Sequence, residues 1–117
     1  MLGYIRGERY SLAVDAGNSR RHVEKFYAAL DAAELRRPDF TVLTHWHWDH
    51  TFGMHHIHGL SAAHMKTNEM LEQERIRLAD SAYADALKEE DPCLEREYAD
   101  GREIVAVPSD IGFTDKM

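Results

Sequence analysis

The sequence predicts a mixed α/β fold, in which short strands alternate with amphipathic helices. Two observations support this prediction: compact β-rich apolar runs at residues 10–14 and 40–43, and apolar residues at helical spacing over residues 20–33 and 68–89. A chain of 117 residues has the length of one domain. We therefore expect a single domain spanning residues 1–117.

Five short segments rich in apolar or β-branched residues are predicted to be strands. They are residues 4–6, 10–14, 40–43, 61–65 and 102–107. Residues 7–9 are expected to form a hairpin turn between the first two. Residues 53–59, bracketed by glycines, are expected to contain a short helical segment, and residues 109–117 have no periodicity.

Two longer segments carry apolar residues on one helical face. The first helix is predicted over about residues 20–33, with Asn18 or Ser19 placed to cap it. The second is predicted as one continuous helix from about residue 68 to residue 89, and Pro92 lies just beyond its end.

Composition narrows the class of function and the compartment. The net charge of −7 disfavours a nucleic-acid binder, which needs a basic patch. No apolar run reaches bilayer length and the N-terminus lacks the apolar stretch of a signal peptide, so no membrane association is expected. The single Cys93 cannot form an internal disulfide, so the cytoplasm is the expected compartment. Cys93 is itself expected to be a buried or half-buried small hydrophobe.

Histidine is unusually clustered in this sequence. Seven of the eight histidines lie between His45 and His64. Six consecutive residues, immediately after the predicted strand 40–43 and Thr44, hold the densest part of the cluster: His45-Trp46-His47-Trp48-Asp49-His50. Because histidine is the commonest metal-ligating side chain, four candidate ligands in six residues predict a metal site.

The spacing of these ligands suits two metal ions. In extended backbone, side chains two residues apart point to the same side, so His45 and His47 can bind one ion. Asp49 and His50 are adjacent and diverge unless the chain turns after Trp48, which would aim them at a second position nearby. Imidazole and carboxylate ligands suit zinc, and also iron or manganese. Such a site can hold a bridging hydroxide and polarise a carbonyl or phosphoryl oxygen.

The residues from Thr44 to His50, followed by Phe52-Gly53, resemble the H-x-H-x-D-H signature of the metallo-β-lactamase superfamily. The strand pair that leads into Asp15-Ala16-Gly17 resembles that superfamily's D-x-G element. The resemblance covers about residues 4–70 well and the remainder loosely. It implies an αββα sandwich with metals at one edge of the sheets, and hydrolysis as the reaction.

The resemblance also implies a role for each motif residue. His45 and His47 match ligands of the first metal, and Asp49 and His50 match ligands of the second. Asp49 would in addition orient the attacking hydroxide, which makes it the candidate catalytic residue. Asp15 matches a position that is structural or supports the ligands. The implied cofactor is Zn²⁺, as one or two ions.

The superfamily's pattern continues with two further histidines and a bridging aspartate, yet no histidine follows His64. We therefore expect the N-terminal half of the sandwich, incomplete at its C-terminus, with one sheet and an uncovered apolar face. The rest of a longer protein or a second copy, forming a homodimer, would cover that face.

Other side chains near the motif leave two interpretations open. Four nearby histidines could fill vacant ligand positions or have ordinary solvated or structural roles: His55, His56, His58 and His64. His22 is expected at the surface of the first helix. Trp46 and Trp48 either fix the loop by packing or form a wall of a substrate pocket.

Three functions are compatible with these features. The first is a metal-dependent hydrolase that acts on a small-molecule ester, thioester, lactone, β-lactam or phosphodiester. The second is a truncated, non-catalytic module of the same superfamily that binds metal and dimerises. The third is a di-iron variant with oxygen or redox chemistry.

Overall fold

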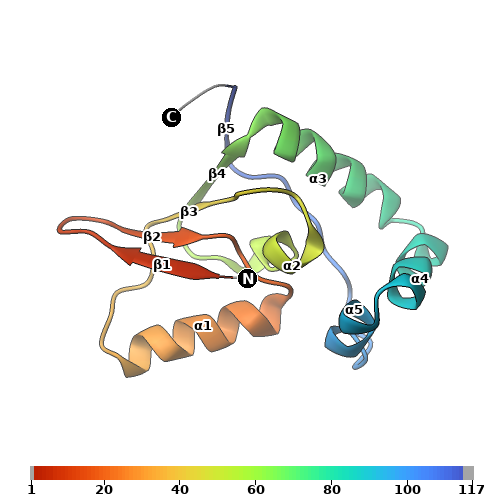
Figure 1. The fold of residues 1–117 in the computed structure, drawn as a ribbon, viewed down its shortest axis with the longest axis horizontal. Coiled ribbons are helices and arrows are strands. Elements are labelled where there is room, and N and C mark those ends of the chain that lie inside the picture. The colour runs from red at the N-terminus through yellow and green to blue at the C-terminus, as the bar shows by residue number, and fades with distance from the viewer. Residues whose placement is uncertain (1, 115–117) are drawn as a thin grey trace.

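The computed structural model describes residues 2–114 and contains one five-stranded sheet with helices around it (Figure 1). The strands are β1 (Gly3–Arg6), β2 (Ser11–Val14), β3 (Phe40–Val42), β4 (Leu60–His64) and β5 (Ile111–Phe113). Their order in the sheet follows the chain order. β1 is antiparallel to β2, and every later neighbouring pair is parallel.

Helical segments connect the parallel strands. They are α1 (Arg20–Ala32), α2 (Trp48–Thr51), the 3₁₀ turn η1 (Met54–His56), α3 (Met65–Arg77), α4 (Ser81–Glu90) and α5 (Pro92–Glu97). The α/β class predicted from the sequence is confirmed, as are the first four strands and the first helix. Within residues 2–114, no helix combines the length and the apolar character needed to cross a membrane.

The sheet topology brings separate loops to one edge. β2, β3 and β4 are parallel, so their carboxyl ends lie at the same side of the sheet. Residues that follow these strands therefore meet there, which is where sheets of this kind generally bind ligands. Asp15 follows β2 and the histidine run follows β3.

The start of α1 agrees with the sequence. Ser19, one of the two predicted caps, accepts a hydrogen bond from the backbone N–H of His22 and so satisfies one free donor of the first turn. Val23, Tyr27 and Leu30 are the buried positions of this helix. They form a small core cluster, onto which the hairpin side chain Tyr4 also packs.

The predicted continuous helix over residues 68–89 is wrong, because the chain breaks between α3 and α4. The side chain of Asp80 accepts a hydrogen bond from the backbone N–H of Ala82 and caps a new helix. The Tyr83 hydroxyl donates to the buried carboxylate of Glu74, which ties α4 back to α3. Local capping and one polar contact thus override the helical periodicity.

Pro92 starts a further short helix that the sequence did not reveal. The side chain of Asp91 accepts hydrogen bonds from the backbone N–H groups of Cys93 and Leu94, and proline occupies the first helical position. Leu94 is buried, whereas the adjacent Cys93 is exposed. The expectation that Cys93 is buried or half-buried is therefore wrong.

The strand predicted over residues 102–107 is also wrong. Ile104 and Ala106 are buried in alternation, but residues 101–109 form no backbone ladder with the sheet. These two side chains pack on Phe52 and on the α5 region instead. The last strand is β5, in the tail predicted to have no element. Alternating burial indicates extended chain but does not supply a partner for backbone hydrogen bonds.

One face of the sheet is bare and apolar. The strand register aligns Leu12, Phe40 and Leu60 in one row across β2, β3 and β4, and Val42, Ala62 and Ile111 in the next row across β3, β4 and β5. Leu60 and Ile111 are 51% and 46% exposed. These side chains line an open hollow of about 420 Å³.

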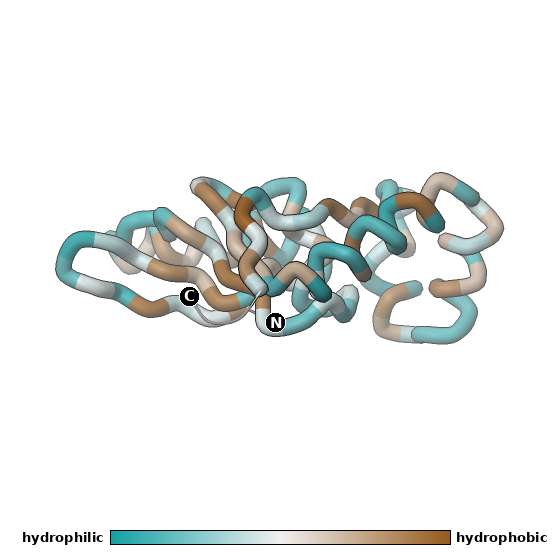
Figure 2. Tube along the Cα trace, turned by 90° about the horizontal axis from the view of Figure 1, so that it is seen from above, coloured by the Kyte–Doolittle hydropathy of each residue, from teal (hydrophilic) through white to brown (hydrophobic). Residues whose placement is uncertain are grey.

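The overall dimensions agree with a sheet that has one uncovered face. The structure measures 46 × 35 × 17 Å, and Figure 2 shows it with the shortest axis vertical. Its accessible surface of 7259 Å² exceeds the roughly 6,500 Å² of a compact monomer of this mass. The excess is close to the roughly 800 Å² that each partner contributes to a standard interface.

Two covers for this face were predicted, the rest of a longer protein and a second copy of the chain, and the second can be tested directly. Leu60→Glu places a carboxylate in the apolar rows, where burial would leave it unpaired. Sedimentation equilibrium should therefore give a dimer for the native chain and a monomer for the variant. Ile76→Glu is the matched control, because Ile76 is 61% exposed on α3 and lies outside the hollow. A native chain that stays monomeric at about 100 µM contradicts this expectation.

Candidate metal centre

The ends of β2 and β3 are joined by Asp15. Its backbone N–H donates to the carbonyl of Val42 at 2.8 Å. Asp15 has a φ of +66° and is 3% exposed, so a non-glycine residue is held in the left-handed region inside the protein. Aspartate tolerates this conformation better than most residues. The local turn therefore directs its carboxylate toward the histidine run.

The Asp15 carboxylate holds both ends of that run. Oδ1 accepts a hydrogen bond from the backbone N–H of Thr44 at 2.8 Å. The Thr44 hydroxyl lies 3.0 Å from Oδ1 and 2.9 Å from Oδ2. Oδ2 lies 2.7 Å from Nδ1 of His50. One buried side chain thus fixes the residue before the motif and the last residue in it.

Helix α2 is the turn that the sequence predicted after Trp48. The backbone N–H of His50 donates to the carbonyl of His47 at 3.0 Å. The Thr51 hydroxyl lies 2.9 Å from the carbonyl oxygen of Trp46 and 3.0 Å from that of His47. These contacts curl the motif back on itself.

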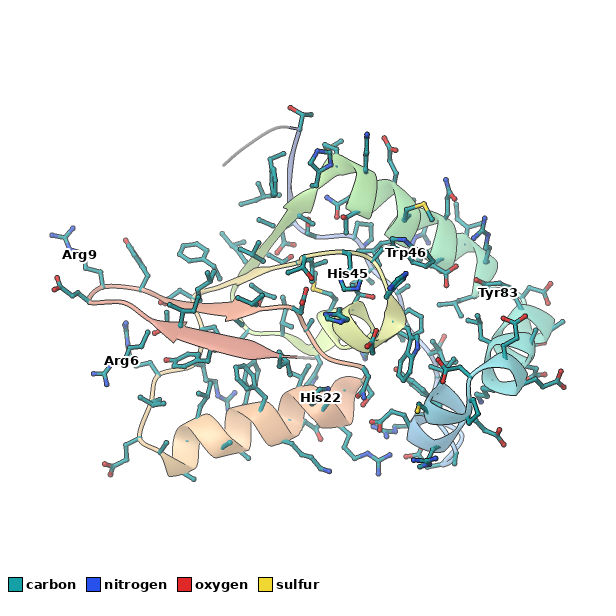
Figure 3. All side chains as sticks on the ribbon, in the orientation of Figure 1. Arg6, Arg9, His22, His45, Trp46 and Tyr83 are labelled. Atoms are coloured by element: carbon teal, nitrogen blue, oxygen red, sulfur yellow. The ribbon has the colours of Figure 1, made fainter. Side chains whose placement is uncertain are left out.

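The predicted ligands gather in one cluster. The ring centroid of His45 lies 4.7 Å from that of His47 and 4.1 Å from that of His50. Nε2 of His50 lies 3.6 Å from Oδ2 of Asp49. Figure 3 shows His45 just beyond β3 and beside α2. The His50 ring therefore packs against the His45 ring while its Nε2 lies beside Asp49.

The protonation of the cluster favours ligation. Partial burial lowers the pKa of His45, and the neighbouring imidazoles of His50 and His47 lower it further. His45 is therefore neutral at neutral pH, which is the form that binds metals. The contact between Nδ1 of His50 and the Asp15 carboxylate leaves Nε2 as the free nitrogen of that ring.

The model of the metallo-β-lactamase superfamily matches residues 3–108. The chain belongs to this superfamily. The resemblance carried by the histidine motif is therefore confirmed, and the chain has the fold of a hydrolase superfamily.

Two solved metallo-β-lactamases share the fold of this superfamily member. The mono-zinc form of FIM-1 from Pseudomonas aeruginosa aligns with 97% of the chain at a TM-score of 0.63 and 13% identity. The enzyme from Hirschia baltica aligns with 97% of the chain at a TM-score of 0.59 and 18% identity. The alignments cover 38% and 40% of those two structures, so the chain spans about two fifths of their length.

A curated relative matches a shorter stretch. The atrochrysone carboxyl ACP thioesterase of Aspergillus fumigatus is 41% identical over 46 residues. The match covers 39% of this chain and 15% of the thioesterase. It supports a hydrolase-type fold and leaves the substrate to be established by experiment.

The two tryptophans of the motif pack on different core clusters. Trp46 contacts the core cluster that contains Leu43 and Leu71. Trp48 packs on the cluster around Phe52, and its indole N–H donates to the Asp91 carboxylate at 2.9 Å. This packing supports the first of the two interpretations, in which the tryptophans fix the loop. Asp91 was not among the residues that the sequence singled out for the site.

The histidines outside the motif have other partners. Nε2 of His56 lies 3.5 Å from the Glu24 carboxylate. His64 uses both ring nitrogens: Nδ1 accepts from the backbone N–H of Lys66, and Nε2 lies 2.8 Å from the carbonyl oxygen of Thr114. His64 is therefore engaged at the start of α3.

Three further histidines are held by local structure or solvent. His55 and His58 are exposed, and the backbone N–H of His58 donates to the Tyr27 hydroxyl. His22 is half-buried rather than fully at the surface as expected, because its Nδ1 accepts a hydrogen bond from the backbone N–H of Asn18.

The cluster meets some but not all requirements of a metal site. Its nitrogen and carboxylate donors are those of a zinc site, and the free nitrogen of His50 lies beside Asp49. Across residues 2–114, however, no three His, Cys, Asp or Glu side chains have an arrangement that would hold a metal ion. The donor chemistry therefore fits a metal, while the ligand set within these residues is not complete.

Asp15→Asn tests the role of the buried carboxylate. Asparagine tolerates the positive φ, but its amide nitrogen is a donor only, so one of the two oxygens that accept from Thr44 and His50 is lost. We expect the free energy of unfolding in urea to fall by about 1–3 kcal/mol.

Asp31→Asn is the matched control, because Asp31 makes an exposed ion pair with Arg37 at 3.2 Å. Its loss should change the free energy of unfolding by less than about 1 kcal/mol. Equal effects of the two substitutions would show that the Asp15 network contributes no special stability.

Proposed function

We propose that the loop from His45 to His50 is the metal-binding part of a zinc-dependent hydrolase site. The observation that carries this proposal is the contact of the His45 ring with the rings of His47 and His50 at the carboxyl edge of the sheet. Membership of the metallo-β-lactamase superfamily supports it.

Four side chains would hold the metal. His45 and His47 would bind one ion, and Asp49 and His50 would bind a second. Zinc is the first choice for this donor set, with iron or manganese as alternatives. When bound, a divalent cation supplies Lewis acidity, which lowers the pKa of water and polarises the bond to be cleaved.

The residues of the chain would prepare the reaction. The Asp49 side chain is 49% exposed, so its carboxylate can accept a hydrogen bond from a water and orient it for attack. His50 is held by Asp15, which keeps its free nitrogen beside Asp49. The half-buried Trp46 and Trp48 keep the loop in place by packing on different core clusters. These contacts reduce the motion that would otherwise disperse the ligands.

A complete site needs more ligands than this loop supplies. Catalytic zinc typically has three protein ligands and one open position. The motif offers two side chains per ion, and the chain spans about two fifths of the solved structures that it matches. The remaining ligands would come from further residues of a longer chain or from a partner subunit.

The proposed substrate is a small molecule with an ester-like bond. A thioester is the first candidate, because a relative is named as a thioesterase, and a β-lactam is the second, because the matching structures are metallo-β-lactamases. Esters, lactones and phosphodiesters are chemically related alternatives. The charge of −7 disfavours a nucleic acid as the phosphodiester.

The incomplete ligand geometry within residues 2–114 favours a second candidate function. In this alternative, the chain is a non-catalytic module that holds one ion weakly and dimerises through its bare sheet face. The two functions differ in metal content and turnover, so one preparation of the chain can distinguish them.

His47→Ala tests the ligand assignment. We expect removal of this imidazole to lower zinc affinity at least about tenfold, measured by competition with a chromophoric chelator. His58→Ala is the matched control, because His58 is exposed and belongs to the turn before β4. Unchanged affinity in His47→Ala would mean that zinc binds elsewhere.

Zinc content and turnover test the reaction. The zinc-loaded chain is assayed on a panel of nitrophenyl esters, thioesters and a β-lactam. Turnover that is lost on chelation and in Asp49→Asn is the expected result, because Asp49 orients the water. One weakly held ion per chain without turnover would instead support the non-catalytic module.

A further inference from the structure

We propose that Thr44 is a positioning residue that selects the tautomer of His45 by linking its imidazole to the Asp15 carboxylate. The consequence for metal binding rests on the proposed function, whereas the tautomer is a property of the metal-free chain. Thr44 immediately precedes the motif, and its sequence position assigns it no role in the site.

The Thr44 hydroxyl touches two groups at once. Its oxygen lies within 3.0 Å of both carboxylate oxygens of Asp15 and 2.9 Å from Nδ1 of His45. A hydroxyl has one proton to donate, and an ionised carboxylate can only accept. The proton of Thr44 must therefore point to Asp15, since otherwise the two electronegative groups would face each other without a proton between them.

The direction of the Thr44 proton determines which ring nitrogen of His45 carries the hydrogen. The hydroxyl oxygen, having donated to Asp15, can only accept from His45. Nδ1 of His45 then carries the hydrogen, and Nε2 keeps its lone pair. A neutral imidazole ligates through the nitrogen that lacks the proton. Thr44 therefore presents Nε2 of His45 for ligation.

Asp15 also selects the Nδ1-protonated tautomer of His50, in this case by direct contact. Its Oδ2 lies 2.7 Å from Nδ1 of His50, so that nitrogen donates and Nε2 is again the free one. One buried carboxylate thus sets two imidazoles, one directly and one through a hydroxyl. The centroids of the two rings are 4.1 Å apart, so an error in either tautomer would place an N–H group where a ligand nitrogen is needed.

The tautomers can be read in the metal-free chain. Long-range ¹H–¹⁵N spectra distinguish a ring protonated at Nδ1 from one protonated at Nε2. We expect the native chain to have His45 and His50 protonated at Nδ1. In Thr44→Val, which keeps the shape but removes the hydroxyl, His45 should shift toward the Nε2-protonated form, while His50 should not change.

Thr44→Ser is the matched control, because it restores the hydroxyl without the methyl group. It should recover the native His45 tautomer. Zinc affinity should fall about tenfold in Thr44→Val and stay near the native value in Thr44→Ser. This rescue would not occur if Thr44 acted only by packing.

Two results would overturn the inference. One is a native His45 protonated at Nε2, which needs no variant to observe. The other is a His45 tautomer that is the same in Thr44→Val as in the native chain. The His45 tautomer could change in Thr44→Val and recover in Thr44→Ser although the chain binds no zinc. That result would uphold the role of Thr44 and refute the proposed metal site.

Discussion

The carboxylate of Asp15 is the contact on which the geometry of the site depends. It is buried behind the histidine cluster, and it bonds to the residue before the motif and to the last residue in it. The backbone of Asp15 also bonds to the end of β3. The same residue therefore joins two strands, closes the loop between them and orients a ring. A buried charge of this kind is retained only where several donors satisfy it together.

The arrangement of the sheet explains why so few residues can build this centre. Parallel β2 and β3 bring Asp15 and the histidine run to the same edge of the sheet. The short helix α2 then turns the run back, and the two tryptophans anchor it to separate core clusters. The segment formed by β3, the histidine run and α2 therefore contains all four candidate ligands.

The sequence predicted the elements whose signals are local. The cap at Ser19, the strands around the motif and the turn after Trp48 follow from neighbouring residues and were confirmed. The break before Asp80 was missed because helical spacing continues across it, although Asp80 caps α4 and the contact between Tyr83 and Glu74 ties α4 back to α3. Tyr83, labelled in Figure 3, belongs to α4.

The candidate site also contains residues that the sequence singled out and residues that it missed. Residue type and spacing singled out the histidines and Asp49 as candidate ligands, because imidazole and carboxylate groups are chemically distinctive. Thr44 and Asp91 act through contacts with residues that folding brings near, so their types alone gave no signal. The strand at residues 102–107 failed for a related reason. The apolar, β-branched run was recognised, but pairing depends on which strand lies alongside, and β4 pairs with β5 instead.

The hydrogen bonding of the sheet does not depend on whether its bare apolar face is covered. Each strand is paired within the sheet, and the opposite side is packed against helices and loops, so removing a cover from the face would break no ladder. Only apolar contact would be lost. The chain therefore has the properties of one partner in fragment complementation, in which separately made pieces associate through a preformed surface and restore the whole. Such a piece can keep its own fold while the association determines whether the site is complete.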